Sequence, residues 1–310
     1  MSTTTDQHRH HPAPRSAVAA AGLALGLGLT GCTAGTVHLS PSTTSARETS
    51  TVVPEASPTM TLDPERDVVV AGRHFRARCG GSGPSVILVA DYGQSMDDTA
   101  PFVQTLAWHG RVCLYDRLGV GRSDSAPHVQ TFSSLADDLD GVISGLGLAR
   151  PVTVLGDMLG APIALTWVSR HEKDARGVLL TMPTPPGFMG PHGTLHRLLP
   201  PKDPGDPELS SLRAELDRFD DPTTNRESLD PRSWDAYLRL PSTSTPLYDL
   251  VGPPSPQWPA SVDAKRVNGA WQQAQSRVLG LSSSSELVTV ASQADWPVVI
   301  TKTLERAMHG

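Results

Sequence analysis

The chain has 310 residues, with 26 Lys and Arg against 32 Asp and Glu, which gives a formal net charge of −6 at pH 7. Hydrophobic residues make up 38% and aromatic residues 5% of the chain, and the mean hydropathy is −0.21. This balance is typical of a soluble globular protein and excludes a membrane protein with several spans. Nucleic-acid binding is also excluded, because the sequence has no basic patch and few aromatic residues.

The first residues have the pattern of an export signal. Arg9 and Arg15 precede an uncharged run over residues 17–30. A helix of that length is too short to cross a bilayer, which takes ~20 residues, but it fits the apolar core of a signal peptide. The run ends in Leu29-Thr30-Gly31-Cys32, which resembles the bacterial lipobox, whose Cys becomes the lipidated first residue of the mature protein.

The lipobox resemblance implies a lipoprotein signal peptide over residues 1–31 and a lipid anchor on Cys32. Such an anchor would hold the protein at the extracytoplasmic face of a bacterial cell membrane. The alternative is an ordinary secretory signal followed by a chance Cys. Residues 32–64 are rich in Ser, Thr and Pro and poor in bulky apolar residues, so we expect a flexible tether there. Residues 65–310 then form the globular domain.

Apolar runs and helical spacings alternate along the globular domain. Strands are expected at residues 68–70, 74–79, 86–90, 112–115, 152–155, 177–180, 246–251 and 286–291. Helices are expected at residues 101–109, 135–146, 161–171, 262–279 and 301–308. This alternation predicts a mostly parallel sheet with helices on both faces. It breaks between about residues 182 and 245, where Pro, Gly, acidic residues and one helix capped by Asp206 predict a cap insertion over the ends of the strands.

The segment Leu114-Tyr-Asp-Arg-Leu-Gly-Val-Gly-Arg-Ser-Asp124 closely resembles the α/β-hydrolase superfamily, whose turn after the fourth strand reads Tyr-Asp-x-x-Gly-x-Gly-x-Ser. An apolar strand upstream and a strand-turn-helix downstream also lie at that superfamily's spacing. The resemblance covers nearly all of residues 67–310. It implies the α/β-hydrolase fold, with an eight-stranded, mostly parallel sheet, helices on both faces and a cap insertion.

Two cysteines, Cys79 and Cys113, remain besides Cys32. In an exported protein an even number of cysteines suggests a disulfide, and the alternative is two buried thiols. The α/β-hydrolase resemblance places the second strand antiparallel beside the fourth. Because Cys79 ends the second predicted strand and Cys113 begins the fourth, the resemblance makes a disulfide between them plausible.

The nucleophile that the resemblance implies is missing. These hydrolases carry it at the centre of a Gly-x-Ser-x-Gly turn between the fifth strand and its helix. Here the turn reads Gly156-Asp157-Met158-Leu159-Gly160, and the thioether of Met158 has no proton to lose and cannot form an acyl-enzyme. Asp157 invites comparison with the carboxylate nucleophile of dehalogenases. It stands one residue early, however, where the turn would aim it away from the site.

The general base and the acid are changed as well. Asp295 stands where a His is expected after the last strand, and at its normal pKa of ~3.9 an Asp is a poor base for a hydroxyl. Gly252–Pro256, where the acid is expected, has no carboxylate. Asp249 lies within the preceding strand and Asp263 on the next helix. The histidines outside these positions are expected to be structural or solvated: His171, His192, His196 and His309.

The oxyanion loop is changed too. Ala90-Asp91 replaces the His-Gly that usually follows the third strand. The backbone N–H groups of Tyr92 and Leu159 would be the oxyanion donors, but the charge of Asp91 beside them would repel a developing oxyanion. Asp91 and Asp157, together with Asp295, would lie at the mouth of a pocket between sheet and cap. They either point to solvent or favour a cationic ligand.

Three functions follow from these observations. The leading hypothesis is a membrane-anchored pseudoenzyme that binds an unknown small apolar ligand or an envelope protein. The first alternative is an active ester or lipid hydrolase with a non-standard site, and the second is a purely structural envelope protein. The altered positions favour the absence of enzymatic activity; an active protein would be a hydrolase of ester bonds. No cofactor is expected, and no metal either, since no suitably spaced His accompanies Cys79 and Cys113.

Overall fold

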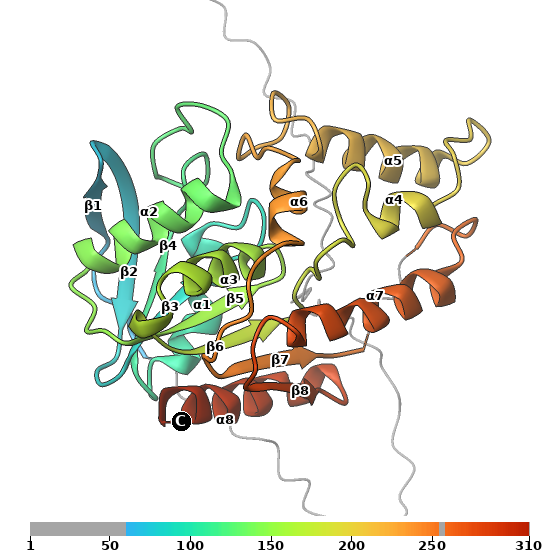
Figure 1. Cartoon of the computed structure of the whole chain (residues 1–310). Coiled ribbons are helices and arrows are strands. Elements are labelled where there is room, and N and C mark those ends of the chain that lie inside the picture. The colour runs from blue at the N-terminus through green and yellow to red at the C-terminus, as the bar shows by residue number, and fades with distance from the viewer. Residues whose placement is uncertain (1–59, 254–257, 310) are drawn as a thin grey trace, which may run out of the picture. The chain divides into compact units, whose positions relative to one another are not determined.

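The computed structural model describes residues 60–253 and 258–309 (Figure 1). The predicted signal peptide, Cys32 and nearly all of the predicted tether lie outside the described residues. No helix within the described ranges is long and apolar enough to cross a membrane. The globular domain begins at least as early as Met60, because the Met60 N–H donates to the Gln104 carbonyl and Leu62 is buried. The start of the globular domain therefore lies at least five residues before Glu65, where the sequence placed it.

An eight-stranded sheet in the order β1-β2-β4-β3-β5-β6-β7-β8 forms the centre of the fold. Its strands are β1 Arg66–Val70, β2 Arg73–Gly80, β3 Ser85–Val89, β4 Arg111–Tyr115, β5 Val152–Asp157, β6 Ala175–Thr181, β7 Leu247–Val251 and β8 Ser285–Thr289. Strand β2 is antiparallel to β1 and to β4, and the remaining pairs are parallel. The predicted eight-stranded, mostly parallel sheet is confirmed.

Helices cover both faces of this sheet (Figure 1). They are α1 Met96–Leu106, α2 Phe132–Gly145, α3 Gly160–Arg170, α7 Ala264–Leu279 and α8 Trp296–His309. Apolar side chains of α1 and α8 pack on one face, and those of α2, α3 and α7 pack on the other. Strand β5 contributes side chains to the apolar clusters on both faces of the sheet, with Val154 in one and Leu155 in the other. This explains its continuous apolar sequence, which is typical of a strand buried on both faces.

Two helices begin five residues earlier than predicted. Helix α1 begins at Met96 because Ser95 and Asp98 form a capping box, with the Ser95 N–H donating to the Asp98 carboxylate at 2.8 Å. Pro101 consequently lies inside the helix and not in its first turn. Helix α8 begins at Trp296, whose buried side chain packs against the sheet, and Pro297 occupies its first turn.

The cap contains three helices, α4 Thr194–Leu198, α5 Pro207–Phe219 and α6 Ser233–Tyr237, where one was predicted. The predicted one is α5, and the Asp206 carboxylate caps it by accepting from the Leu209 N–H at 2.9 Å. The two helices that were missed have five residues each, too few for a periodic apolar pattern. A separate apolar cluster joins α4 and α5 to the start of α7.

A disulfide joins Cys79 of β2 to Cys113 of β4. The two residues face each other directly in the antiparallel pair, and their Cα atoms lie 4.0 Å apart. The bond closes a loop with a sequence separation of 34 residues, which restricts the unfolded chain.

Reduction of this disulfide is expected to lower the free energy of unfolding by about 3 kcal/mol. Urea unfolding with and without dithiothreitol measures the difference, and thiol titration of the unfolded chain counts the cysteines that reduction releases. Equal midpoints under both conditions, with both thiols free before reduction, would contradict the expectation.

Candidate functional site

The turn between β5 and α3 keeps the backbone of a nucleophile elbow. Met158 at its tip has φ of 43°, in the left-handed region that side chains with a Cβ rarely adopt. A Cβ on Gly160 would lie 1.9 Å from the Val89 carbonyl oxygen, and one on Gly156 would lie 2.9 Å from the Ala161 Cα. Both glycines are therefore required by close packing, and the sharp turn presents a thioether where a hydrolase presents a hydroxyl.

The Asp91 carboxylate accepts hydrogen bonds from the two backbone N–H groups that the sequence predicts as oxyanion donors. Asp91 follows β3, and its Oδ1 accepts a hydrogen bond from the Leu159 N–H at 3.0 Å. The carboxylate also accepts a backbone hydrogen bond from Tyr92. Both N–H groups that the sequence singled out as oxyanion donors are thus engaged by a side chain of the protein itself.

Asp91 and Asp157 interact with each other and are partly buried. Burial, and then the charge of Asp157, raise the pKa of Asp91 to about 7. Burial raises the pKa of Asp157 to about 6, against the effect of the Thr181 hydroxyl, which donates to Asp157 Oδ1 at 2.6 Å. The ends of β3 and β5 therefore hold both residues partly buried and close enough for their charges to interact, whereas the sequence led us to expect Asp157 to point away from the site.

An ion pair between Arg117 and Glu227 lies next to the Asp91 loop. The two side chains are 2% and 1% exposed, and Arg117 donates to both carboxylate oxygens of Glu227 at 2.7 Å. Arg117 also donates to the carbonyls of Ala90 at 2.7 Å and Asp91 at 2.9 Å. Glu227 accepts from the Gly93 N–H at 2.7 Å. The pair therefore fixes the whole loop after β3.

The cap closes over the same loop. The Tyr92 hydroxyl accepts from the Arg226 N–H at 2.6 Å, and the Tyr92 ring meets Phe219 of α5 edge-on, with ring centroids 5.0 Å apart. Arg226 also donates to the Gly93 carbonyl at 3.1 Å. Contacts from the cap thus cover the loop after β3.

Asp295 does not join the two buried acids. It is exposed in a short helix after β8, where its carboxylate accepts from the Ser292 hydroxyl at 2.7 Å. Asp249 of β7 is 0% exposed, and neither of its carboxylate oxygens has a partner within the described structure. Burial raises the pKa of Asp249 to about 7. Its side chain therefore lies inside the domain and not on the loop where a catalytic acid would be expected.

The four histidines that the sequence analysis named lie in other parts of the structure than the elbow. His196 of α4 pairs with Asp220 at 2.8 Å within the cap, and the His171 ring stacks on Trp167 with centroids 5.2 Å apart. His192 lines a cavity in the cap, and His309 is exposed at the end of α8. Within the described part of the chain, no three His, Cys, Asp or Glu side chains gather as metal ligands.

Two cavities lie elsewhere. One of about 420 Å³ lies in the cap, and the other, of about 360 Å³, lies at the ends of β7 and β8. Met158, Asp91 and Asp157 line neither of them. The prediction that Asp91 and Asp157 stand at the mouth of a pocket between sheet and cap stays a prediction.

Comparison with known proteins gives the class of fold. Residues 83–187 match the sequence model of Hydrolase_4, described as serine aminopeptidase, S33. The structure is similar to an enol-lactonase from Burkholderia xenovorans LB400, with a TM-score of 0.55 and 18% identity over 79% of this chain and 100% of that one. A haloalkane dehalogenase, DatA from Agrobacterium tumefaciens C58, gives a TM-score of 0.52 and 19% identity over 79% and 96%. The chain has the α/β-hydrolase fold, as predicted.

One curated protein also matches in sequence. It is the uncharacterized protein YqjL of Bacillus subtilis (strain 168), which is 24% identical over 110 residues. That alignment covers 36% of this chain and 44% of YqjL, so the similarity spans less than half of either protein.

Proposed function

We propose that this chain is a membrane-anchored α/β-hydrolase-fold lipoprotein that does not catalyse acyl transfer and acts by binding a ligand or a partner. One observation carries the proposal: the Asp91 carboxylate accepts the Leu159 N–H at 3.0 Å, where a hydrolase would bind the oxyanion of its substrate. In either protonation state the side chain takes up this donor, and in its ionised form its charge also opposes the same charge in a transition state.

The other parts of the machinery support the same conclusion. Acyl transfer needs a nucleophile and a base within hydrogen-bond reach of it. Met158 supplies no proton, and Asp295 is exposed and hydrogen-bonded to Ser292. The proposed anchor rests on the lipobox resemblance at residues 29–32, and with it the extracytoplasmic location.

A working hydrolase on ester or lipid substrates is the second candidate. The observation that favours it is the pKa of about 7 for Asp91 and about 6 for Asp157, because a general base works best with a pKa near the operating pH. Its substrate would have to displace the cap contacts of Tyr92 before it reached these acids.

Turnover of p-nitrophenyl butyrate and labelling by a fluorophosphonate probe separate the two candidates. The purified chain is expected to show neither turnover above background nor label. The double variant Met158→Ser/Asp295→His is expected to remain inactive as well, because Asp91 still occupies the Leu159 N–H and no acid follows β7. The single variant Met158→Ser is the matched control.

A burst of p-nitrophenol from the double variant would contradict this expectation. Turnover by the unchanged chain would favour the second candidate, and mass spectrometry of any labelled peptide would then identify the nucleophile. Circular dichroism of each sample confirms that an inactive chain is folded.

A further inference from the structure

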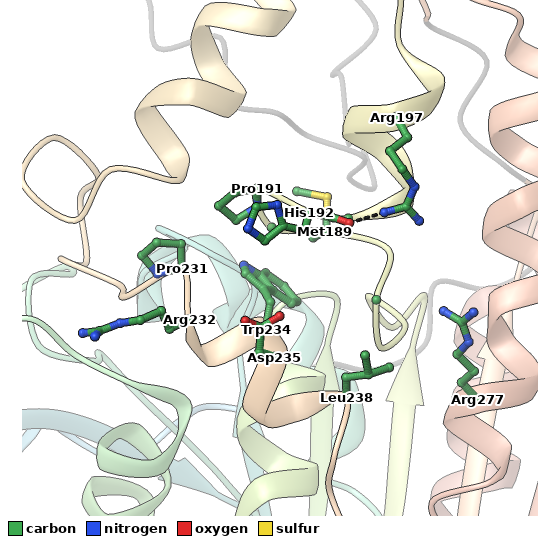
Figure 2. Close-up of a pocket in the computed structure, with 13 residues that line it drawn as sticks. Met189, Pro191, His192, Arg197, Pro231, Arg232, Trp234, Asp235, Leu238 and Arg277 are labelled. Carbon is green, nitrogen blue, oxygen red and sulfur yellow. Dashed lines mark hydrogen bonds between the residues drawn. The ribbon is translucent and has the colours of Figure 1, made fainter.

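The cap cavity of about 420 Å³ has the size of a small-molecule site, for which ~300–1,000 Å³ is usual. It lies among the loop after β6, α4, α6 and α7 (Figure 2). Trp234 of α6 is 3% exposed and packs edge-on against Phe132 of α2, with ring centroids 5.0 Å apart. This contact fixes one wall of the cavity to the core of the domain.

The lining of this cavity is basic although the chain is acidic. Three arginines line it, Arg197, Arg232 and Arg277, against the single carboxylate of Asp235. Arg232 is already paired, because its Nη2 lies 2.7 Å from the Asp230 carboxylate. The charge that distinguishes the cavity therefore belongs to the other two arginines.

Arg197 and Arg277 keep their charges uncompensated. Arg197 donates to the His192 carbonyl and to the Thr194 hydroxyl, the latter at 2.9 Å. Arg277 donates through Nη1 to the Pro186 carbonyl at 3.0 Å. Neither forms an ion pair with any residue in the described ranges, and Figure 2 shows that they reach the cavity from different helices, α4 and α7.

Apolar surface lies beside these cations. Leu238 lines the cavity and is 50% exposed, which is unusual for so large an apolar side chain, and the indole of Trp234 lies close to it in Figure 2. Guanidinium groups bind carboxylates and phosphates through paired hydrogen bonds. The cavity thus offers a cationic part and an apolar part to one ligand.

We propose that the cap cavity binds a small amphipathic anion, whose carboxylate or phosphate head pairs with Arg197 and Arg277 and whose apolar body lies against Leu238 and the edge of Trp234 that lines the cavity. This inference rests on the proposed function, because it names the class of ligand that the non-catalytic protein would bind. The sequence suggested a binding site beside the elbow, between sheet and cap. The proposed site lies instead in the cap cavity.

Isothermal titration calorimetry of the purified chain with octanoate and with octyl phosphate tests the proposal. Saturable binding of at least one of these two amphiphiles is expected, and their relative affinities show whether a carboxylate or a phosphate head group is preferred. Arg197→Gln and Arg277→Gln should each weaken it by about tenfold, the loss typical of one charged hydrogen-bonded contact. Both arginines are exposed, so their replacement leaves the core intact. Arg239→Gln, an exposed arginine outside the cavity, is the matched control and should bind as the unchanged chain does.

Three results would overturn the inference. They are the absence of saturable binding of both amphiphiles, equal binding by all three variants, and binding of 1-octanol or inorganic phosphate as tight as that of the amphiphiles. The ester assay remains independent. Hydrolysis together with arginine-dependent binding would overturn only the proposed absence of catalysis. Absence of both hydrolysis and binding would overturn only this inference.

Discussion

Glu227→Gln is expected to lower the free energy of unfolding by about 3–5 kcal/mol, because it leaves the buried guanidinium of Arg117 without its counter-charge. Both side chains are almost fully buried, so solvent cannot replace the lost partner. Equilibrium unfolding in urea measures the loss. Hydrogen exchange at Gly93, whose N–H donates to Glu227, should become faster than in the unchanged chain.

The matched control is Glu286→Gln, which removes the partner of Arg306 from an ion pair with side chains 46% and 51% exposed. Its cost should stay below about 1 kcal/mol, as is typical of exposed pairs. Equal losses for the two variants would mean that the Arg117 pair contributes no more than a surface contact.

Asp249→Asn is expected to stabilise the protein by about 4 kcal/mol above pH 7 and to have almost no effect near pH 4. The pKa of Asp249 is raised by burial from 3.8 to about 7 in the folded protein. At a pH between these two pKa values, the carboxyl group of Asp249 is protonated in the folded state and ionised in the unfolded state. The contribution of Asp249 to the free energy of unfolding is therefore largest below about pH 4. It falls as the pH rises to about 7 and is constant above that pH.

Urea unfolding of both chains between pH 4 and pH 8 measures this difference curve. The raised pKa values of Asp91 and Asp157 also make the stability fall with rising pH. Because both residues are present in the unchanged chain and in the variant, their effect cancels in the difference. Asp235→Asn, which changes an exposed carboxylate, is the control and should change the stability far less than Asp249→Asn does. A difference for Asp249→Asn that is flat from pH 4 to pH 8 would show that its carboxyl group titrates normally.

The sheet and the elbow could be predicted because their signals are local. Apolar runs mark strands buried on both faces, and the separation of Gly156 and Gly160 marks a turn that no larger residue fits. The short helices α4 and α6 could not be predicted in this way. A segment of five residues is too short to show the helical spacing of apolar residues. Contacts with neighbouring apolar side chains, not their own sequence, hold these two helices in place.

The charged parts of the site depend on contacts that no sequence window contains. Arg117 stands within the turn that revealed the fold, yet its partner Glu227 lies 110 residues further on, in the cap. The direction of Asp157 is likewise set by Thr181 of the neighbouring strand. The sequence predicts that the charge of Asp91 is unfavourable to an oxyanion. That Asp91 itself accepts from the Leu159 N–H depends on how β3 and β5 lie side by side, which no local pattern contains.

The Arg117–Glu227 pair also ties the cap to the loop after β3. If the cap could leave the loop after β3 only by breaking this pair, at a cost of about 4 kcal/mol, then about one molecule in a thousand would be open at any moment. A cap held in this way would act as a fixed wall and not as a lid that opens for each substrate. The cavity between α4 and α7 is lined by neither member of this pair, so its contents could exchange while the cap stays in place.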